Sequence, residues 1–244
     1  MTAVGVTPDE RIAGCTAVIE RGRPATPQVV TARFRRAEAY FRKGDIDHAI
    51  ADYDDVVGQS RADLRAAYDY ADADPSGAVP TRSARTSERD RYVAQAYRAR
   101  GIASFEAGLL EQSQDDFKRL SAMDRKDAEA ALWLDLARRR AGLASDLADR
   151  AKQLDMSKWP APIVRLFLGQ GTAEAALAAA EEGNRVMRRT RRCEASFFAG
   201  ELMLQQGQDA GAMRLIDRAL AECAPASGER SVADAEARIL RVMP

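Results

Sequence analysis

Small and apolar residues recur along the chain with the spacing of amphipathic helices, and one such segment occurs three times. Its copies occupy residues 30–44, 94–108 and 193–207, and each ends in glycine before a second amphipathic segment begins. Apolar residues at every third or fourth position form one face of a helix, and a glycine after the last turn can adopt the left-handed cap conformation. The pattern therefore predicts an all-α chain of paired helices, which presents a surface rather than performs a reaction.

The first complete repeat, residues 29–57, illustrates such a pair. We expect a first helix from Thr31 to Lys43 and a second from Ile46 to Val57. Gly44 lies where the first helix needs a left-handed cap, and Asp45 can cap the second. Two helices and a tight turn in about 34 residues is the period of the tetratricopeptide repeat.

The residues at the interlocking positions resemble those of tetratricopeptide repeats. The first copy has Ala37, Tyr40, Gly44, Ala49 and Tyr53, the second has Tyr97, Gly101, Gly108 and Phe117, and the last has Ser196, Gly200, Gly207, Ala212, Ile216, Ala219 and Pro225. The match is degenerate, since Ser104 and Ser113 stand where a tyrosine and an alanine are usual. The resemblance implies a tetratricopeptide-like superhelix of antiparallel helix pairs.

The copies are unevenly spaced, but we expect one helical-repeat domain over residues 1–244. It comprises N-terminal repeats at 9–57, an insertion at 58–91 and C-terminal repeats at 92–244. The helix expected at 9–20 resembles the second helix of a repeat whose first helix would precede Met1. Within the insertion we expect a helix from Ser60 to Asp74 and a mobile loop at 75–87, which has two prolines and no apolar period.

The repeats between the second and last copies have drifted, but their helices can still be placed. We expect them at 127–141, 144–154, 159–169 and 173–182, with helices continuing to Arg241. Thr172 is expected to cap the helix that begins at Ala173.

Residues 92–240 carry a second, narrower resemblance. Its motifs are Arg100-Gly101-Ile102-Ala103, Gln114-Asp115-Asp116, Leu132-Trp133-Leu134, Trp159 with Ile163-Val164, Phe167-Leu168-Gly169, and Glu194 with Phe197-Phe198 and Gly200. In this order they resemble NlpI-type tetratricopeptide lipoproteins of the bacterial envelope. That resemblance implies a lipid-anchored, often dimeric adaptor that holds peptidoglycan hydrolases and a protease together. The chain departs from that type in having no lipid-attachment cysteine after an apolar segment, so the sequence does not predict anchoring. Its N-terminal third also differs, and because that type dimerises largely through its N-terminal helices, a homodimer is a candidate state only.

The cysteines bear on the compartment. Cys193 is expected to open the first helix of the last copy and Cys223 to end the second, so the two should be neighbours in an antiparallel pair. A disulfide between them, which would indicate an oxidising compartment, and two small buried thiols are both compatible with this placement. Cys15 is expected to pack in the core or to pair with a cysteine preceding Met1.

The composition argues against some classes of protein but does not identify a function. The chain has 37 basic and 37 acidic residues, and this zero formal charge gives no overall attraction to nucleic acid or anionic lipid. No apolar run approaches the roughly 20 residues that cross a bilayer, so we expect no transmembrane segment. Residues 1–8 carry no signal peptide, so a periplasmic location requires an export signal before Met1, and a cytoplasmic one is expected otherwise.

No arrangement of residues indicates catalysis. The single histidine, His48, is expected to be a solvated residue in the turn before a helix, and the acidic pairs at 54–55 and 115–116 and the nearby Asp52 are expected to face water. Phosphate-binding loops, nucleophile elbows and metal-ligand spacings are missing from the sequence. We therefore predict a protein that is not an enzyme and has no catalytic residue, cofactor or metal.

We expect partner binding in a concave groove lined by the first helix of each repeat. The predicted groove residues are Phe34, Glu38, Phe41, Arg42, Gln95, Arg98, Ile102, Phe105, Glu106, Glu194, Phe197, Glu201 and Gln205. The four phenylalanines would accept a peptide or helix of another protein, and the charged residues would select it. A neighbouring helix or the chain's own tail could instead cover them.

An arginine-rich stretch at 185–192 supports an alternative function. It contains Arg185, Arg188, Arg189, Arg191 and Arg192, which could bind phosphate or RNA in a cytosolic module. No aromatic residues that could stack on bases alternate with these arginines. The sequence therefore favours a protein partner over a nucleic acid.

Overall fold

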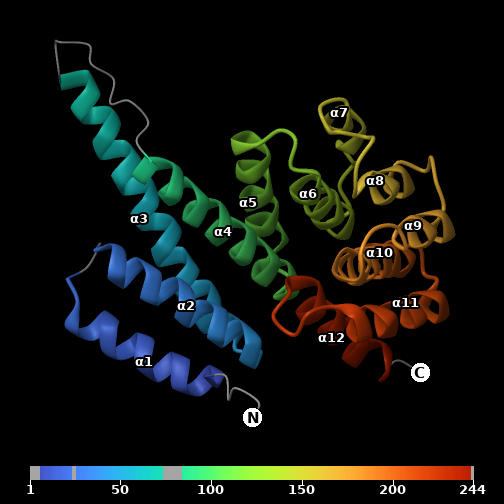
Figure 1. Ribbon diagram of the computed structural model, residues 1–244, viewed down its shortest axis with the longest axis horizontal. Coiled ribbons are helices and arrows are strands. Elements are labelled where there is room, and N and C mark those ends of the chain that lie inside the picture. Colours follow the sequence, from blue (N-terminus) through green and yellow to red (C-terminus); the bar gives the residue numbers. More distant parts are fainter. Residues whose placement is uncertain (1–5, 24–25, 74–83, 243–244) are drawn as a thin grey trace. The chain divides into compact units, whose positions relative to one another are not determined.

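The computed structural model describes residues 6–23, 26–73 and 84–242, with side chains described outside 60–91. Within these residues all regular structure is helical, with twelve helices and no strand, so the predicted all-α class is confirmed (Figure 1). The helices form two compact units, Met1–Ala103 and Ser104–Pro244.

The first unit contains α1 (Pro8–Arg21), α2 (Pro27–Lys43), α3 (Ile46–Ala73) and most of α4 (Ala84–Glu106). Local signals position the first two helices: Thr7 and Glu10 form a capping box at α1, and Thr26 caps α2. Gly44 has the left-handed conformation predicted for it, with φ 76°, so α2 turns directly into α3. In Figure 1, α1 lies beside α2 and α2 lies beside α3.

An ion pair joins the three N-terminal helices inside this unit. Arg36 of α2 donates two hydrogen bonds of 2.7 Å to the carboxylate of Asp52 in α3, and a third of 3.0 Å to Thr16 in α1. Asp52 is buried, which corrects the expectation that it faces water. A buried carboxylate needs such a charged partner, because an unpaired charge inside a protein costs several kcal/mol.

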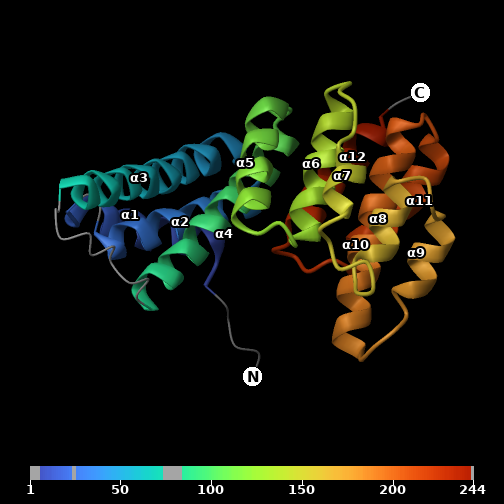
Figure 2. The same ribbon diagram turned by 90° about the horizontal axis from the view of Figure 1, so that it is seen from above.

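The second unit contains the end of α4 and eight further helices. These are α5 (Leu110–Met123), α6 (Ala128–Arg140), α7 (Leu147–Ala151), α8 (Ala161–Phe167), α9 (Ala173–Ala179), α10 (Arg185–Gln205), α11 (Asp209–Glu222) and α12 (Gly228–Leu240). Consecutive helices pack as neighbours, with α5 on α6, α8 on α9 and α10 on α11; Figures 1 and 2 both show the last pair side by side. Gly108 and Gly207, with φ of 75° and 70°, follow the ends of α4 and α10.

Trp133 of α6 is the centre of the core of this unit. Its side chain is fully buried, and four phenylalanine rings surround it with centroid separations of 5.1 to 5.8 Å. These rings belong to Phe105 of α4, Phe117 of α5, and Phe197 and Phe198 of α10. One indole therefore joins helices that are far apart in the sequence.

Several predicted boundaries were wrong. Helix α3 is continuous through Gly58, the residues 84–87 assigned to the mobile loop begin α4, and the rest of that loop, 75–83, lies outside the described residues. The helix expected at 144–154 is only α7, and Asn184 caps α10 two turns before Cys193. Asp116 is buried, although it was expected to face water. Cys15 is half-buried and so lies outside the fully buried core, to which α1 contributes no residue.

Candidate functional site

The residues predicted for a groove on the first unit are only partly accessible. Phe34 is buried, with 8% of its surface exposed, because it packs on Tyr53 of α3 at 5.7 Å and on Tyr92 of α4 at 6.3 Å. Phe41, Glu38 and Arg98 are half-buried, and Arg42 and Gln95 are exposed. The role predicted for Phe34 was therefore wrong, and Phe41 is the one predicted phenylalanine that retains exposed surface.

The remaining apolar groove residues are in the core. Phe105 and Phe197 have 0% exposure because both pack against Trp133, and Ile102 has 6%. Glu201, predicted to select a partner by charge, also has 0% exposure. These four assignments were wrong: Phe105, Phe197 and Glu201 contact α6 inside the second unit, and Ile102 is buried as well.

The chain's own last helix covers part of the predicted surface. Ser231 of α12 donates a hydrogen bond of 2.7 Å to the carboxylate of Glu106, and Glu236 of α12 pairs with Arg140 at 2.7 Å. Arg140 also pairs with Glu201 at 2.6 Å, and its guanidinium lies 4.1 Å from the centroid of the Phe105 ring. The alternative that the sequence left open is therefore what the structure contains: neighbouring helices cover Phe34, Phe105 and Phe197, and the last helix contacts Glu106.

Burial changes the acidity of the predicted charge-selecting residues. It raises the pKa of Glu201 to about 8, although the nearby Arg140 lowers it. It raises the pKa of Glu194 to about 7, against a hydrogen bond from Trp159. Burial also raises the pKa of Glu106, while the bond from Ser231 opposes the shift. Glu201 and Glu194 are therefore partly or largely protonated at neutral pH.

The raised pKa values predict that the second unit loses stability as pH rises. Between the ordinary value of 4.5 and the raised values of about 7 and 8, the folded chain binds more protons than the unfolded chain, so the free energy of unfolding falls across that window. At about 1.4 kcal/mol for each pKa unit, the two shifts together correspond to a loss of several kcal/mol between pH 5 and pH 8. Urea unfolding at several pH values measures it.

Two variants test the cause of this pH dependence. Glu201→Gln removes the titrating group but keeps an acceptor for Arg140, so it should flatten the decline. Glu174→Gln is the control, since Glu174 is exposed and its pKa is lowered, which places its titration below the window. A slope unchanged by Glu201→Gln, or stability that rises from pH 5 to pH 8, would contradict the account.

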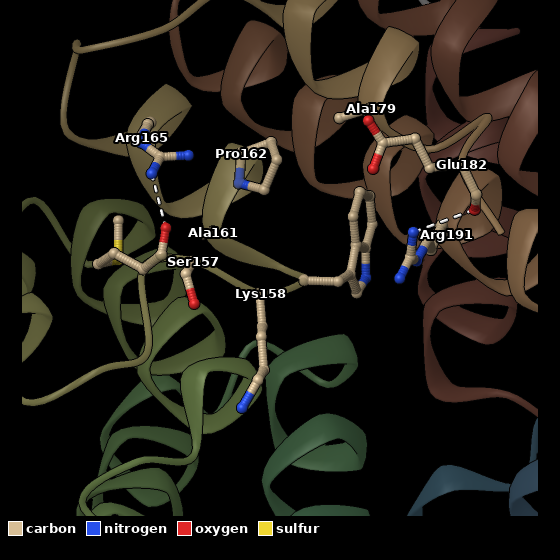
Figure 3. Close-up of a pocket in the computed structure, with 10 residues that line it drawn as sticks. Ser157, Lys158, Ala161, Pro162, Arg165, Ala179, Glu182 and Arg191 are labelled. Carbon is tan, nitrogen blue, oxygen red and sulfur yellow. Dashed lines mark hydrogen bonds between the residues drawn. The ribbon is translucent and has the colours of Figure 1, made fainter.

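A pocket of about 550 Å³ opens on the second unit. Its walls come from the loop before α8, from α8 itself, from the end of α9 and from α10. Figure 3 shows Ser157, Lys158, Pro162 and Arg165 on one side, and Ala179, Glu182 and Arg191 on the other. We call it the Trp159 pocket after the one aromatic residue in its lining.

Trp159 is a half-buried side chain that polar contacts hold in place. Its indole N–H donates to the carboxylate of Glu194 over 2.5 Å, and the Arg191 guanidinium lies 5.3 Å from its ring centroid. Glu194, predicted to line a groove, therefore supports the wall of this pocket. An indole positioned in this way offers an apolar surface with little conformational entropy left to lose on binding.

Neither arginine of the Trp159 pocket forms an ion pair with a carboxylate among the described residues, although Arg191 is near enough to Glu194 to oppose the rise of its pKa. Arg165 donates to the main-chain carbonyl of Met156 over 2.6 Å, and Arg191 donates to that of Glu182 over 3.0 Å. A carbonyl satisfies a donor but does not neutralise a charge. Lys158 differs, because it pairs with Asp155 at 2.8 Å.

Some arginines of the stretch at 185–192 form ion pairs or hydrogen bonds with the rest of the second unit, and others are exposed. Arg192 pairs with Glu181 at 3.5 Å and with Glu222 at 3.3 Å, and Arg189 donates to the carbonyl of Glu222 over 3.0 Å. Arg185 and Arg188 are exposed and have no ion-pair partner in the described part of the chain. Only part of this stretch therefore presents free positive charge.

Cys193 and Cys223 form a disulfide with a Cα–Cα distance of 4.7 Å. Cys193 lies inside α10, and Cys223 is the C-cap of α11. The pair is the one that the sequence suggested, although Cys193 does not open its helix. The bond fixes α10, which carries Arg191, against α11.

The sequence did not single out the Trp159 pocket. Trp159 and Arg165 lay in a segment interpreted as a short apolar helix, Trp159 was otherwise noted only in the NlpI-type resemblance, and Arg191 was grouped with its arginine neighbours. The one available signal was Arg165, a charged residue inside the apolar run 161–168. A pocket assembled from several segments gives no local pattern.

Membrane spans, metal clusters and similarity to known proteins also bear on the function. No described helix has the length and apolarity needed to span a bilayer, and no group of His, Cys, Asp and Glu side chains in the described ranges could hold a metal ion. No protein-family model matches the chain, and no curated protein is significantly similar to it in sequence. The tetratricopeptide and NlpI-type resemblances therefore stay predictions.

Proposed function

We propose that this chain is a non-catalytic, tetratricopeptide-like adaptor that binds a segment of another protein in the Trp159 pocket. The observation that carries the proposal is an accessible pocket where a half-buried tryptophan lies beside an arginine without a carboxylate partner. Tryptophan and arginine are enriched among the residues that dominate binding energy at protein interfaces. This site replaces the phenylalanine groove as the proposed surface.

The disulfide supports an adaptor that works in an oxidising compartment such as the bacterial periplasm. Disulfides persist in such compartments and are rare where glutathione and thioredoxin keep thiols reduced. Cys193 and Cys223 lie in the same unit as the pocket. The proposed envelope location rests on this bond together with the resemblance to NlpI-type proteins.

Peptide display against the oxidised full chain tests the proposal. We expect selection to enrich a peptide whose affinity falls about tenfold in Arg191→Met, since a hydrogen bond to a charged group contributes roughly 1.5–3 kcal/mol. Arg185→Met is the control, because it removes a different arginine, which is exposed, from the same helix. Residues six positions apart on a helix are separated by about 240°, so Arg185 and Arg191 point in different directions.

Other outcomes of the selection would contradict the proposal. Enriched peptides that bind both variants as tightly as the parent would place binding elsewhere. The alternative RNA-associated module predicts binding of an oligouridine that weakens steeply with salt and that Arg185→Met and Arg188→Met reduce. If the chain binds oligouridine in this way and no enriched peptide depends on the pocket, the RNA-associated module would replace the adaptor as the proposed function.

A further inference from the structure

We infer that the Trp159 pocket selects an acidic segment of the partner protein, with side-chain carboxylates bound by Arg165 and Arg191 and an apolar neighbour on Trp159. This inference rests on the proposed function and adds the chemistry of the ligand. It uses two guanidinium groups on different walls of one pocket and the indole near one of them (Figure 3).

The pocket carries positive charge that a ligand could meet. Among the described residues, Arg165 and Arg191 each donate a hydrogen bond to a main-chain carbonyl. Each guanidinium has five N–H donors in a planar fork that matches a carboxylate. A ligand carboxylate would therefore gain charge-assisted bonds without displacing an ion pair.

The carboxylate of Glu182 favours a peptide over a nucleic acid as the ligand of this pocket. Its exposed carboxylate lines the same pocket and has no described ion-pair partner, so it repels an anion placed beside it. A nucleic acid carries a charge at every nucleotide and cannot avoid this repulsion. A peptide can space its carboxylates and place an uncharged residue next to Glu182.

Part of the pocket lining is apolar. Pro162, Ala161 and Met156 line it together with Trp159. These surfaces favour a hydrophobic side chain between the acidic ones, because burial of apolar surface is favourable at about 25 cal/mol per Å². The chemistry of the site therefore fits glutamate or aspartate alternating with an apolar residue.

Fluorescence anisotropy with two short labelled peptides tests the inference. The probe alternates glutamate with leucine, and its control has glutamine at each glutamate position. We expect the glutamate peptide to bind the full chain at least tenfold more tightly than the glutamine peptide, and Arg191→Met or Arg165→Met to weaken it about tenfold. Arg185→Met should leave its affinity within twofold.

Glu182→Gln should change the affinity in the opposite direction, so a general loss of structure cannot imitate its effect. Since Glu182 is exposed and its carboxylate has no described partner, this variant should keep its fold and bind the glutamate peptide about threefold more tightly. Unchanged affinity in Glu182→Gln, equal binding of both peptides, or equal loss in Arg185→Met and Arg191→Met would overturn the inference. Tighter binding of an oligouridine than of the glutamate peptide would also overturn it.

The display experiment separates failure of this inference from failure of the proposed function. Enriched peptides that depend on Arg191 but contain no acidic residue would leave the adaptor intact and overturn the acidic selectivity. Enriched peptides that ignore every pocket variant would overturn both.

Discussion

Replacing Trp133 with alanine should lower the free energy of unfolding of the second unit by about 3–5 kcal/mol. The indole is fully buried and contacts rings from α4, α5 and α10, so its removal leaves a cavity where these helices meet. The cavity cannot close without moving helices that other contacts hold. Urea unfolding followed by circular dichroism measures the loss.

Two controls separate the role of Trp133 from tryptophan loss in general. Trp133→Phe keeps an aromatic ring in the cavity, so its loss should be clearly smaller. Trp159→Ala removes the other tryptophan, which is only half-buried, and should also cost less. A loss for Trp133→Ala no larger than that for Trp159→Ala would contradict the assignment of Trp133 as the centre of the core.

Removing the disulfide should have the second largest effect. The bond joins residues separated by 30 positions, and closing a loop of that size stabilises a fold by about 3–4 kcal/mol through the entropy of the unfolded chain. We expect the double variant Cys193→Ser, Cys223→Ser to unfold at a correspondingly lower urea concentration. Reductant should shift the parent chain in the same direction.

Cys15→Ser is the matched control for the disulfide, since Cys15 is the one free thiol. That variant should keep the full response to reductant. Mass measurement after alkylation of the denatured, unreduced chain should show one modified cysteine. Three modified cysteines after oxidative expression would contradict the bond and remove the support for an oxidising compartment.

The sequence predicted best the features that neighbouring residues determine. Gly44 ends α2 as expected because a residue with φ of 76° is easily accommodated only without a side chain. The all-α class followed in the same way from the spacing of apolar positions. These signals act within one or two helical turns, so a single sequence contains them.

Features that depend on distant segments could not be predicted in this way. Phe105 and Phe197 lie on the helix faces where groove residues were expected, and only the approach of α10 to α6 makes those faces internal. The same apolar face serves a groove or a core, depending on what packs against it. The Trp159 pocket was missed for the same reason, since Arg165 and Arg191 belong to different helices.

A peptide that occupies the Trp159 pocket should shield Trp159 from acrylamide, a quencher of tryptophan fluorescence. The chain has two tryptophans; Trp133 is fully buried, so Trp159 supplies the accessible emission. With the display-selected peptide at saturating concentration, we predict that this emission becomes protected from acrylamide, and that Arg191→Met at the same peptide concentration loses the protection. Quenching that stays unchanged while anisotropy shows the peptide bound would contradict the claim.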